Sequence, residues 1–162
     1  MIPKVLTGAL AAMALTTASA GQAATCWNGE RLAAARIAEF NTAMMVTTLR
    51  CSLINIDIRA SYDAFIVNYK SRLQGADDTL KRQFEEPQGG AGEKNYHQFY
   101  TQIGNRYGAA KTDSAQCALF SAVAAELARA GRNDETLDKY AFALVPNPAI
   151  SGERCAEIAL RP

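Results

Sequence analysis

Four cysteines constrain the fold of this 162-residue chain more than any other feature of its sequence: Cys26, Cys51, Cys117 and Cys155. They follow an N-terminal segment that is typical of a secretory signal peptide. Lys4 precedes an apolar run over residues 5–15, and small residues follow that run. The run is too short to span a bilayer. We therefore expect a periplasmic or secreted protein, in which the cysteines form disulfides rather than a metal site.

The predicted signal peptide covers residues 1–20, although cleavage as late as residue 23 fits its pattern almost as well. The remaining residues, 21–162, are enough for a single helical domain with one core. Lys4 is the one charged residue that cleavage removes, so 16 basic residues remain against 16 acidic ones. That balance argues against a nucleic-acid partner and against an anionic membrane surface.

Lipidation of Cys26 is an alternative outcome of export. Thr25 stands directly before Cys26, where a lipid-modified cysteine normally has a small Gly, Ala or Ser. Lipidation would also leave three cysteines, an odd number for a secreted protein. We therefore expect an unmodified Cys26 that takes part in a disulfide.

Helical periodicity runs through most of the chain. In the first segment, apolar or small residues recur every three or four positions, as on one face of a helix: Ala33, Ile37, Phe40, Met44, Thr47 and Cys51. Similar stripes predict further helices over residues 58–84, 96–107, 113–131 and 133–144. The sequence therefore predicts an all-α fold, a four-helix up-down bundle with a short fifth helix and a disulfide-stapled tail.

Local signals predict where these helices begin and end. N-cap residues are expected at three helix starts: Asn28, Asp113, and Asn133 or Asp134. Gly75 predicts that the second helix either bends or restarts at Asp77 or Asp78. Gly108 suits the left-handed position that follows a helix. The Gly-rich residues 87–92 form the clearest loop signal in the chain.

The predicted helices also decide how the cysteines pair. A single helix over residues 28–51 would separate Cys26 from Cys51 by roughly 37 Å, at about 1.5 Å per residue. A disulfide needs Cα atoms within about 7 Å, so this pair is excluded, and Cys117–Cys155 with it. In an up-down bundle Cys51 and Cys117 lie at one end, and the tail can return to Cys26 at the other. We therefore predict Cys51–Cys117 and Cys26–Cys155.

Aromatic residues supply the candidate ligand or partner surface. Five tyrosines and the single histidine belong to the second and third predicted helices: Tyr62, Tyr69, Tyr96, His97, Tyr100 and Tyr107. They would line a cavity between those helices, or else pack at helix contacts with their hydroxyls at the rim. His97 has no partner residues at metal-ligand or catalytic spacing, which favours a boundary position on its helix.

Carboxylates are the remaining candidates for chemistry. Glu30, Glu39, Asp57 and Asp63 are available for acid–base work on an envelope polysaccharide, but none stands in an apolar stretch. Glu126, flanked by alanines and a leucine, is the acidic residue that we expect to be most buried, with Arg50 or Arg129 as its partner. The arginines of the first half are expected to solvate helix faces.

The sequence has no nucleophile elbow, metal-ligand spacing or cofactor fingerprint, and residues 89–92 lack the rest of a phosphate-binding loop. It therefore predicts a non-enzymatic binding or interaction component of the bacterial cell envelope, with no cofactor and no metal. Two alternatives are a carrier or sensor of a small apolar ligand with a tyrosine-lined cavity, and a carboxylate-dependent envelope hydrolase. The expected partner is an envelope protein or a small apolar ligand, not nucleic acid, and the chain is not expected to span a membrane.

Overall fold

The computed structural model describes residues 26–85 and 92–155. Five helices make up this part of the chain: α1 (Gly29–Ser52), α2 (Arg59–Glu85), α3 (Gly92–Gly108), α4 (Ser114–Ala130) and α5 (Asp134–Leu144). The prediction of an all-α up-down bundle with a short fifth helix is confirmed. The predicted signal peptide, its cleavage site and most of the Gly-rich loop lie outside the described residues.

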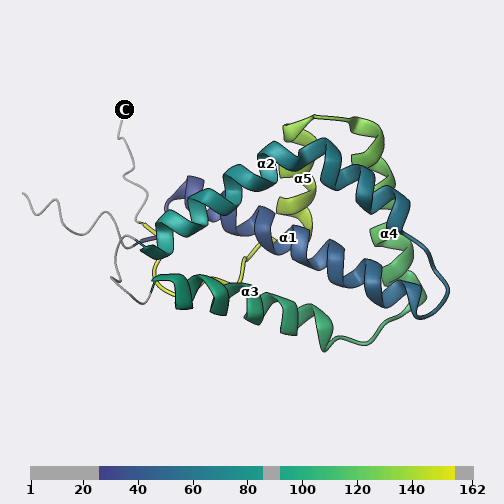
Figure 1. Cartoon of the computed structure of the whole chain (residues 1–162), viewed down its shortest axis with the longest axis horizontal. Coiled ribbons are helices and arrows are strands. Elements are labelled where there is room, and N and C mark those ends of the chain that lie inside the picture. Colours follow the sequence, from purple (N-terminus) through teal and green to yellow (C-terminus); the bar gives the residue numbers. More distant parts are fainter. Residues whose placement is uncertain (1–25, 86–91, 156–162) are drawn as a thin grey trace, which may run out of the picture.

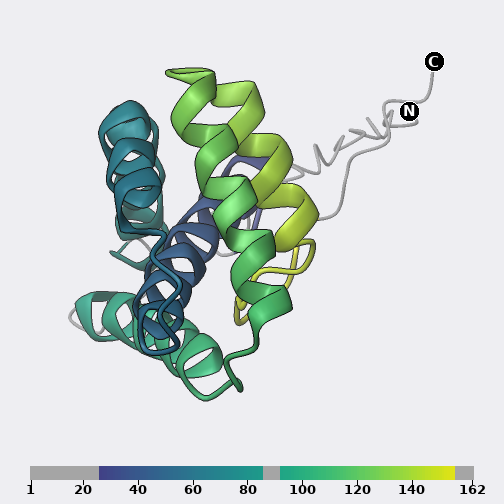
Figure 2. The same ribbon diagram turned by 90° about the vertical axis from the view of Figure 1, so that its right-hand side faces the viewer.

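Helix α1 is the central element, and it packs against each of the other four helices. Figure 1 shows α2 along one side of α1 and α3 along the other. The hairpin of α4 and α5 lies behind them and crosses the long helices steeply, as the turned view in Figure 2 also shows. Within the described residues, the side of α1 between α2 and α3 is therefore left without a covering helix.

The helix starts follow the local capping signals. The Asn28 side chain accepts a 2.9 Å hydrogen bond from the backbone N–H of Arg31. Asp113 accepts one of 2.7 Å from the N–H of Gln116. Asn133 caps α5 in the same way. These bonds satisfy backbone donors that have no partner within the helix, so all three predicted caps are confirmed.

The restart that Gly75 suggested as one alternative does not occur, and the prediction of a left-handed Gly108 is wrong. Helix α2 continues through Gly75 without a restart, so Asp77 is not a cap. Gly108 is the last residue of α3 and does not have a positive φ. The Arg50 guanidinium ends α3 instead, because it donates to the carbonyls of Tyr107 and Gly108. A side chain thus satisfies the terminal carbonyls that a left-handed glycine turn would have satisfied.

The sequence predicts that the arginines of α1 solvate its surface. In the structure, two of them also bind other elements. Arg36 donates to the carbonyls of Val145 and Pro146 just after α5, at 3.0 and 3.3 Å. Its guanidinium also lies 4.7 Å from the ring centroid of Phe142. Together with Arg50, it ties α1 to the ends of two later helices.

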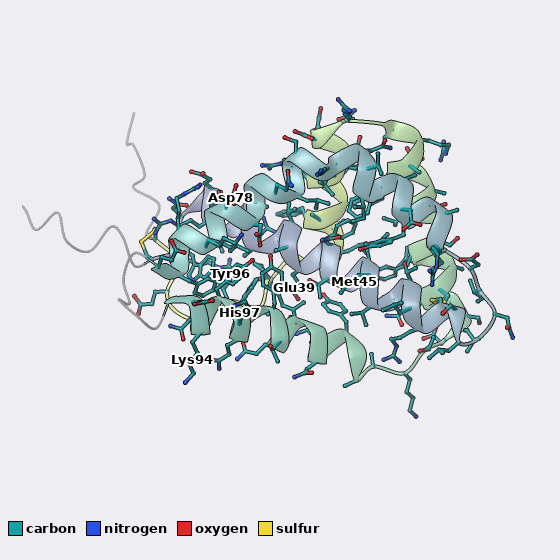
Figure 3. All side chains as sticks on the ribbon, in the orientation of Figure 1. Glu39, Met45, Asp78, Lys94, Tyr96 and His97 are labelled. Atoms are coloured by element: carbon teal, nitrogen blue, oxygen red, sulfur yellow. A yellow bond between two sulfur atoms is a disulfide. The ribbon has the colours of Figure 1, made fainter. Side chains whose placement is uncertain are left out.

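The core forms around the predicted apolar face of α1. Phe40 and Met44 are fully buried, and the Phe40 ring meets Phe65 of α2 edge-on with centroids 6.0 Å apart. Side chains fill the space between the helices in Figure 3. Tyr69 extends this aromatic contact along α2, with its ring 5.6 Å from that of Phe65.

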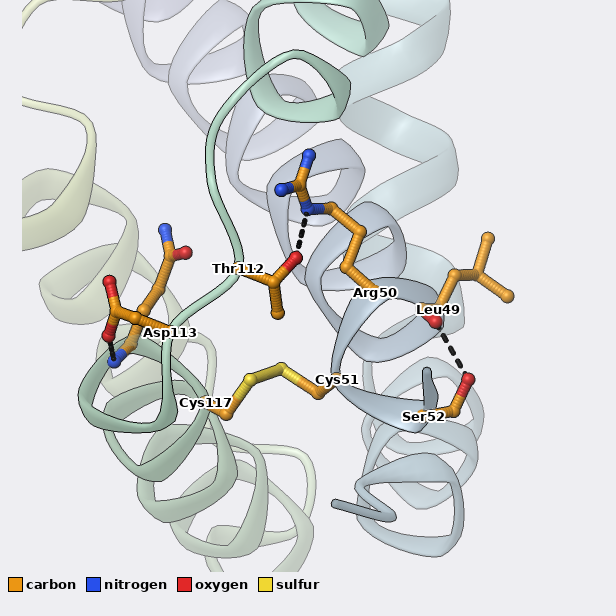
Figure 4. The surroundings of a disulfide bond; sticks show 8 residues. Leu49, Arg50, Cys51, Ser52, Thr112, Asp113 and Cys117 are labelled. Atoms are coloured by element: carbon orange, nitrogen blue, oxygen red, sulfur yellow. Dashed lines mark hydrogen bonds between the residues drawn. A yellow bond between two sulfur atoms is a disulfide. The ribbon is translucent and has the colours of Figure 1, made fainter. Parts of the chain in front are cut away.

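Two disulfides close the fold, and both join the predicted pairs. Cys51 at the end of α1 is bonded to Cys117 in the first turn of α4, with Cα atoms 5.7 Å apart (Figure 4). In the same region Arg50 donates a 2.9 Å hydrogen bond to the hydroxyl of Thr112. Cys26, just before α1, is bonded to Cys155 in the tail. The N-terminal side of the domain is therefore fastened to its C-terminal segment.

Candidate functional site

A groove between α2 and α3, floored by α1, is the candidate site. We call it the α2–α3 groove. It has a volume of about 640 Å³, and its lining comes mostly from α2: Asn41 of α1, Ile66, Lys70, Leu73, Gln74, Asp77, Asp78 and Lys81 of α2, and Tyr100 of α3. This volume is within the range of roughly 300–1,000 Å³ that is usual for ligand sites.

One end of the groove is a cluster of polar groups around Asp77. The hydroxyls of Tyr96 and Tyr100 both donate to its Oδ1, the latter at 2.8 Å. Lys81, one turn further along α2, lies 2.8 Å from its Oδ2. Both carboxylate oxygens are therefore engaged, and the cluster joins α3 to α2.

These contacts change the pKa values of the groups involved. Burial raises the pKa of the Asp77 carboxyl, but the hydrogen bonds from Lys81, Tyr96 and Tyr100 outweigh burial and hold it below its ordinary value. Burial and the Asp77 carboxylate raise the pKa of Tyr96 to about 12, and they raise that of Tyr100 as well. The cluster therefore keeps Asp77 ionised and both phenols neutral, a state that suits a structural clamp better than proton transfer.

Beyond Asn41, the one α1 residue that lines the groove, α1 carries exposed apolar side chains. Met45 and Leu49 lie one and two turns after Asn41 on α1, and their exposed fractions are 43% and 54%. Figure 3 places Met45 between α2 and α3. Leu53 follows directly after α1 and is 82% exposed. The charged, hydrogen-bonded groove is thus followed along α1 by exposed apolar residues.

The structure brings only part of the predicted aromatic surface together. Tyr96 and Tyr100 meet at Asp77, with ring centroids 5.1 Å apart. Tyr69 is buried in the core beside Phe65. Tyr62 is half-buried and packs at the other side of Phe65, one turn before the groove residue Ile66.

His97 and Tyr107 lie in different surroundings from this pair. The His97 side chain is 67% exposed, and its Nε2 lies 3.6 Å from Glu93 one turn earlier on α3. It contacts the ring of Tyr96, with centroids 5.4 Å apart. The Tyr107 hydroxyl instead donates a 3.1 Å hydrogen bond to Glu39 of α1. The six predicted residues therefore form several local contacts rather than one cavity lining.

Glu39, rather than Glu126, is the buried carboxylate. Its side chain is fully buried and lies 2.8 Å from a guanidinium nitrogen of Arg106, while Ala149 of the tail donates its N–H to the second oxygen. Glu126 is 38% exposed and pairs with Arg129, one of its two expected partners. Small residues one turn either side of Glu39, Ala35 and Ala43, are the sequence signal that its neighbours can approach closely.

Comparisons with known proteins add no relative. Neither a protein-family model, nor a curated protein, nor a solved structure matches this chain. Within residues 26–85 and 92–155, no three His, Cys, Asp or Glu side chains are grouped so as to hold a metal ion. No helix in that part of the chain is long and apolar enough to cross a bilayer. The α2–α3 groove is therefore the feature that bears most directly on function.

Proposed function

We propose that this protein is a non-enzymatic binding component of the bacterial cell envelope, and that it holds a protein partner in the α2–α3 groove. The two disulfides fit a protein that works in an oxidising compartment. The predicted signal peptide fits export to the periplasm or beyond. Residues 21–162 would then form the mature, single-domain protein.

The exposed apolar residues that follow the groove along α1 are the observation that carries this proposal. Met45 and Leu49 are adjacent on one face of α1, and both keep about half of their surface in water. Fully burying a Met or Leu side chain gains about 1.5–3 kcal/mol, so covering the exposed half of each residue here would gain about half of that. Apolar residues that continue a groove with a polar rim mark a docking surface more often than isolated exposed ones do.

A protein partner is favoured over a small apolar ligand. Among the described residues that line the groove, Tyr100 is the one tyrosine, and its hydroxyl is engaged by Asp77. Charged side chains from Lys70, Asp78 and Lys81 surround the same space. A segment that offers apolar residues at one end and polar groups at the other matches this surface better than a wholly apolar molecule.

The test is co-purification from the native envelope with charge variants. Met45→Glu and Leu49→Glu should each weaken partner binding at least about tenfold, because a carboxylate would be desolvated in the interface. Val67→Glu is the matched control, since Val67 is 70% exposed but lies on α2 and not on the apolar face of α1 that carries Met45 and Leu49. Equal recovery of the partner with all three variants would contradict a role for this groove.

A further inference from the structure

A second pocket lies on the other side of α3, between the end of α2 and the C-terminal tail. It has a volume of about 350 Å³ and shares no lining residue with the α2–α3 groove. We call it the amide pocket, because four carboxamide side chains line it: Gln83 of α2, and Asn95, Gln98 and Gln102 of α3. Among the described residues, no charged side chain contributes to its lining.

Hydrogen bonds and a disulfide fix the C-terminal residues that line this pocket. The Trp27 indole N–H donates a 2.8 Å hydrogen bond to the Ser151 carbonyl. Backbone hydrogen bonds of 2.9 and 3.0 Å join Trp27 to Glu153 and to Cys155, beside the Cys26–Cys155 disulfide. Ser151 and Gly152, which face the pocket, are therefore fixed relative to Trp27 and the start of α1, as a preformed binding site requires.

The three amides of α3 lie along a single helix face. Asn95, Gln98 and Gln102 are three and four residues apart, the spacing of neighbours on a helix surface. Gln98 and Gln102 are exposed. Each carboxamide both donates and accepts hydrogen bonds. This face is suited to a ligand whose own groups also do both.

Gln83 is the observation that points to a ligand. It is only 4% exposed, and its buried Oε1 has no hydrogen-bond partner among the described residues. An amide left in this state at a pocket wall is destabilising unless a bound group or an ordered water hydrogen-bonds to it. Phe84 and Phe99 lie beside it in the pocket wall, with ring centroids 5.7 Å apart.

We propose that the amide pocket binds an uncharged saccharide that carries an acetamido group. Sugar hydroxyls donate and accept, so they match the carboxamides of α3. An acetamido group would present its C=O and N–H to Gln83 and its methyl group to the Phe84 and Phe99 rings. The absence of charged lining groups in the described chain disfavours an anionic or cationic ligand.

Tri-N-acetylchitotriose and cellotriose make a matched pair of probes, because they share a sugar backbone and differ in the acetamido groups. In a titration followed by amide NMR, chitotriose should shift the signals of Gln98, Gln102 and Gly152. Cellotriose should bind at least about tenfold more weakly, since it lacks the hydrogen bonds to Gln83. Equal binding of both sugars, or no shift with chitotriose at millimolar concentration, would overturn the proposal.

Variants locate the binding to this pocket. The double change Gln98→Ala with Gln102→Ala should weaken chitotriose binding about tenfold or more without altering thermal unfolding, because both residues are exposed. Gln74→Ala is the control, since Gln74 is an exposed glutamine in the other groove. Unchanged binding in the double variant, or a preference for an uncharged peptide over chitotriose, would also overturn the proposal.

Discussion

At the scale of single residues, the buried carboxylate of Glu39 couples three parts of the fold. It accepts hydrogen bonds from Arg106 and Tyr107 of α3 and from the backbone of Ala149 in the tail. A buried charge is tolerated only when its oxygens are satisfied in this way. Glu39 therefore contributes to stability and is not available as a general acid or base.

We expect Glu39→Gln to lower the free energy of unfolding by about 1.5–3 kcal/mol, because charge-assisted hydrogen bonds to a buried group are lost. Chemical denaturation measures this change. Glu126→Gln is the control: Glu126 is partly exposed and pairs within its own helix, so its loss should be below about 1 kcal/mol. Equal effects of the two changes would show that burial of Glu39 does not matter.

The tyrosines that bond to carboxylates predict a pH dependence. Burial, followed by the neighbouring carboxylates, raises the pKa of Tyr96 and of Tyr107 to about 12. In the unfolded chain these phenols titrate near their ordinary value of about 10. The native state then holds its protons more tightly, so the stability that these groups contribute is complete below about pH 10 and declines as the pH rises toward 12.

The corresponding measurement is the free energy of unfolding between about pH 10 and pH 12. It should fall less steeply with pH in Tyr96→Phe and in Tyr107→Phe than in the unaltered protein, because one tightly held proton is removed from the native state. A decline with the same slope in all three proteins would mean that these hydroxyls titrate normally.

Residue-level predictions from the sequence succeeded where the cause is local. The cap roles of Asn28, Asp113 and Asn133 depend on backbone N–H groups three residues away, so the sequence contains both partners. The burial of Glu39 depends on α3 and on the tail, 67 and 110 residues further along the chain. No local pattern specifies partners so far along the chain. The small residues near Glu39 were the only signal in the sequence that its carboxylate could be buried.

At the scale of elements, a close approach between the end of α2 and the start of α3 fixes their crossing. Gly92 begins α3, and a Cβ atom placed there would lie 2.8 Å from the Glu85 Cα and 2.8 Å from the Phe84 carbonyl oxygen. These atoms belong to the backbone and cannot move aside as the end of a flexible side chain can. The glycine is therefore required by packing rather than by its φ angle.

We expect Gly92→Ala to lower the free energy of unfolding by about 1–3 kcal/mol, the usual cost of overpacking. Gly104→Ala in the same helix should raise it by up to about 1 kcal/mol, because nothing lies within 4 Å of its new Cβ and alanine favours a helix. Thermal unfolding of both variants measures the contrast. Stabilisation by both changes would contradict the close contact at Gly92.

Helix positions and types were predictable because each helix carries its own apolar stripe and end signals. The helix does not restart after Gly75, because a glycine lowers helix propensity by only about 1 kcal/mol. The packing of a 27-residue helix outweighs this cost. Gly108 does not adopt the predicted left-handed conformation, because Arg50, 58 residues earlier, donates a hydrogen bond to its carbonyl at the end of α3. At Gly108, a tertiary contact thus overrode a local preference.

At the scale of the whole molecule, the disulfide pairing was predictable from helix length together with the up-down topology. A rigid helix keeps Cys26 and Cys51 apart, so only one pairing agreed with an up-down arrangement, and the structure has it. The two cross-links close loops that span 66 and 129 residues. In the chain-entropy model, each stabilises the fold by about 4–5 kcal/mol.

The candidate sites were less predictable than the fold. The sequence indicated tyrosines between the second and third helices, and Tyr96 and Tyr100 do meet there on Asp77. The sequence did not indicate that Met45 and Leu49 would be exposed on α1, because both belong to an apolar stretch that predicts burial in the core. Which side of a central helix remains uncovered depends on where all the other helices pack.

The most direct test of the central claim is site-specific photo-crosslinking in the native envelope. A crosslinker placed at position 49, on the exposed apolar face of α1, should give one defined adduct with a protein partner. The same crosslinker at position 67, on the exposed side of α2, should give none, and Met45→Glu should abolish the adduct at position 49. The absence of any adduct at position 49, or the same adduct from both positions, would contradict the groove as the partner-binding surface.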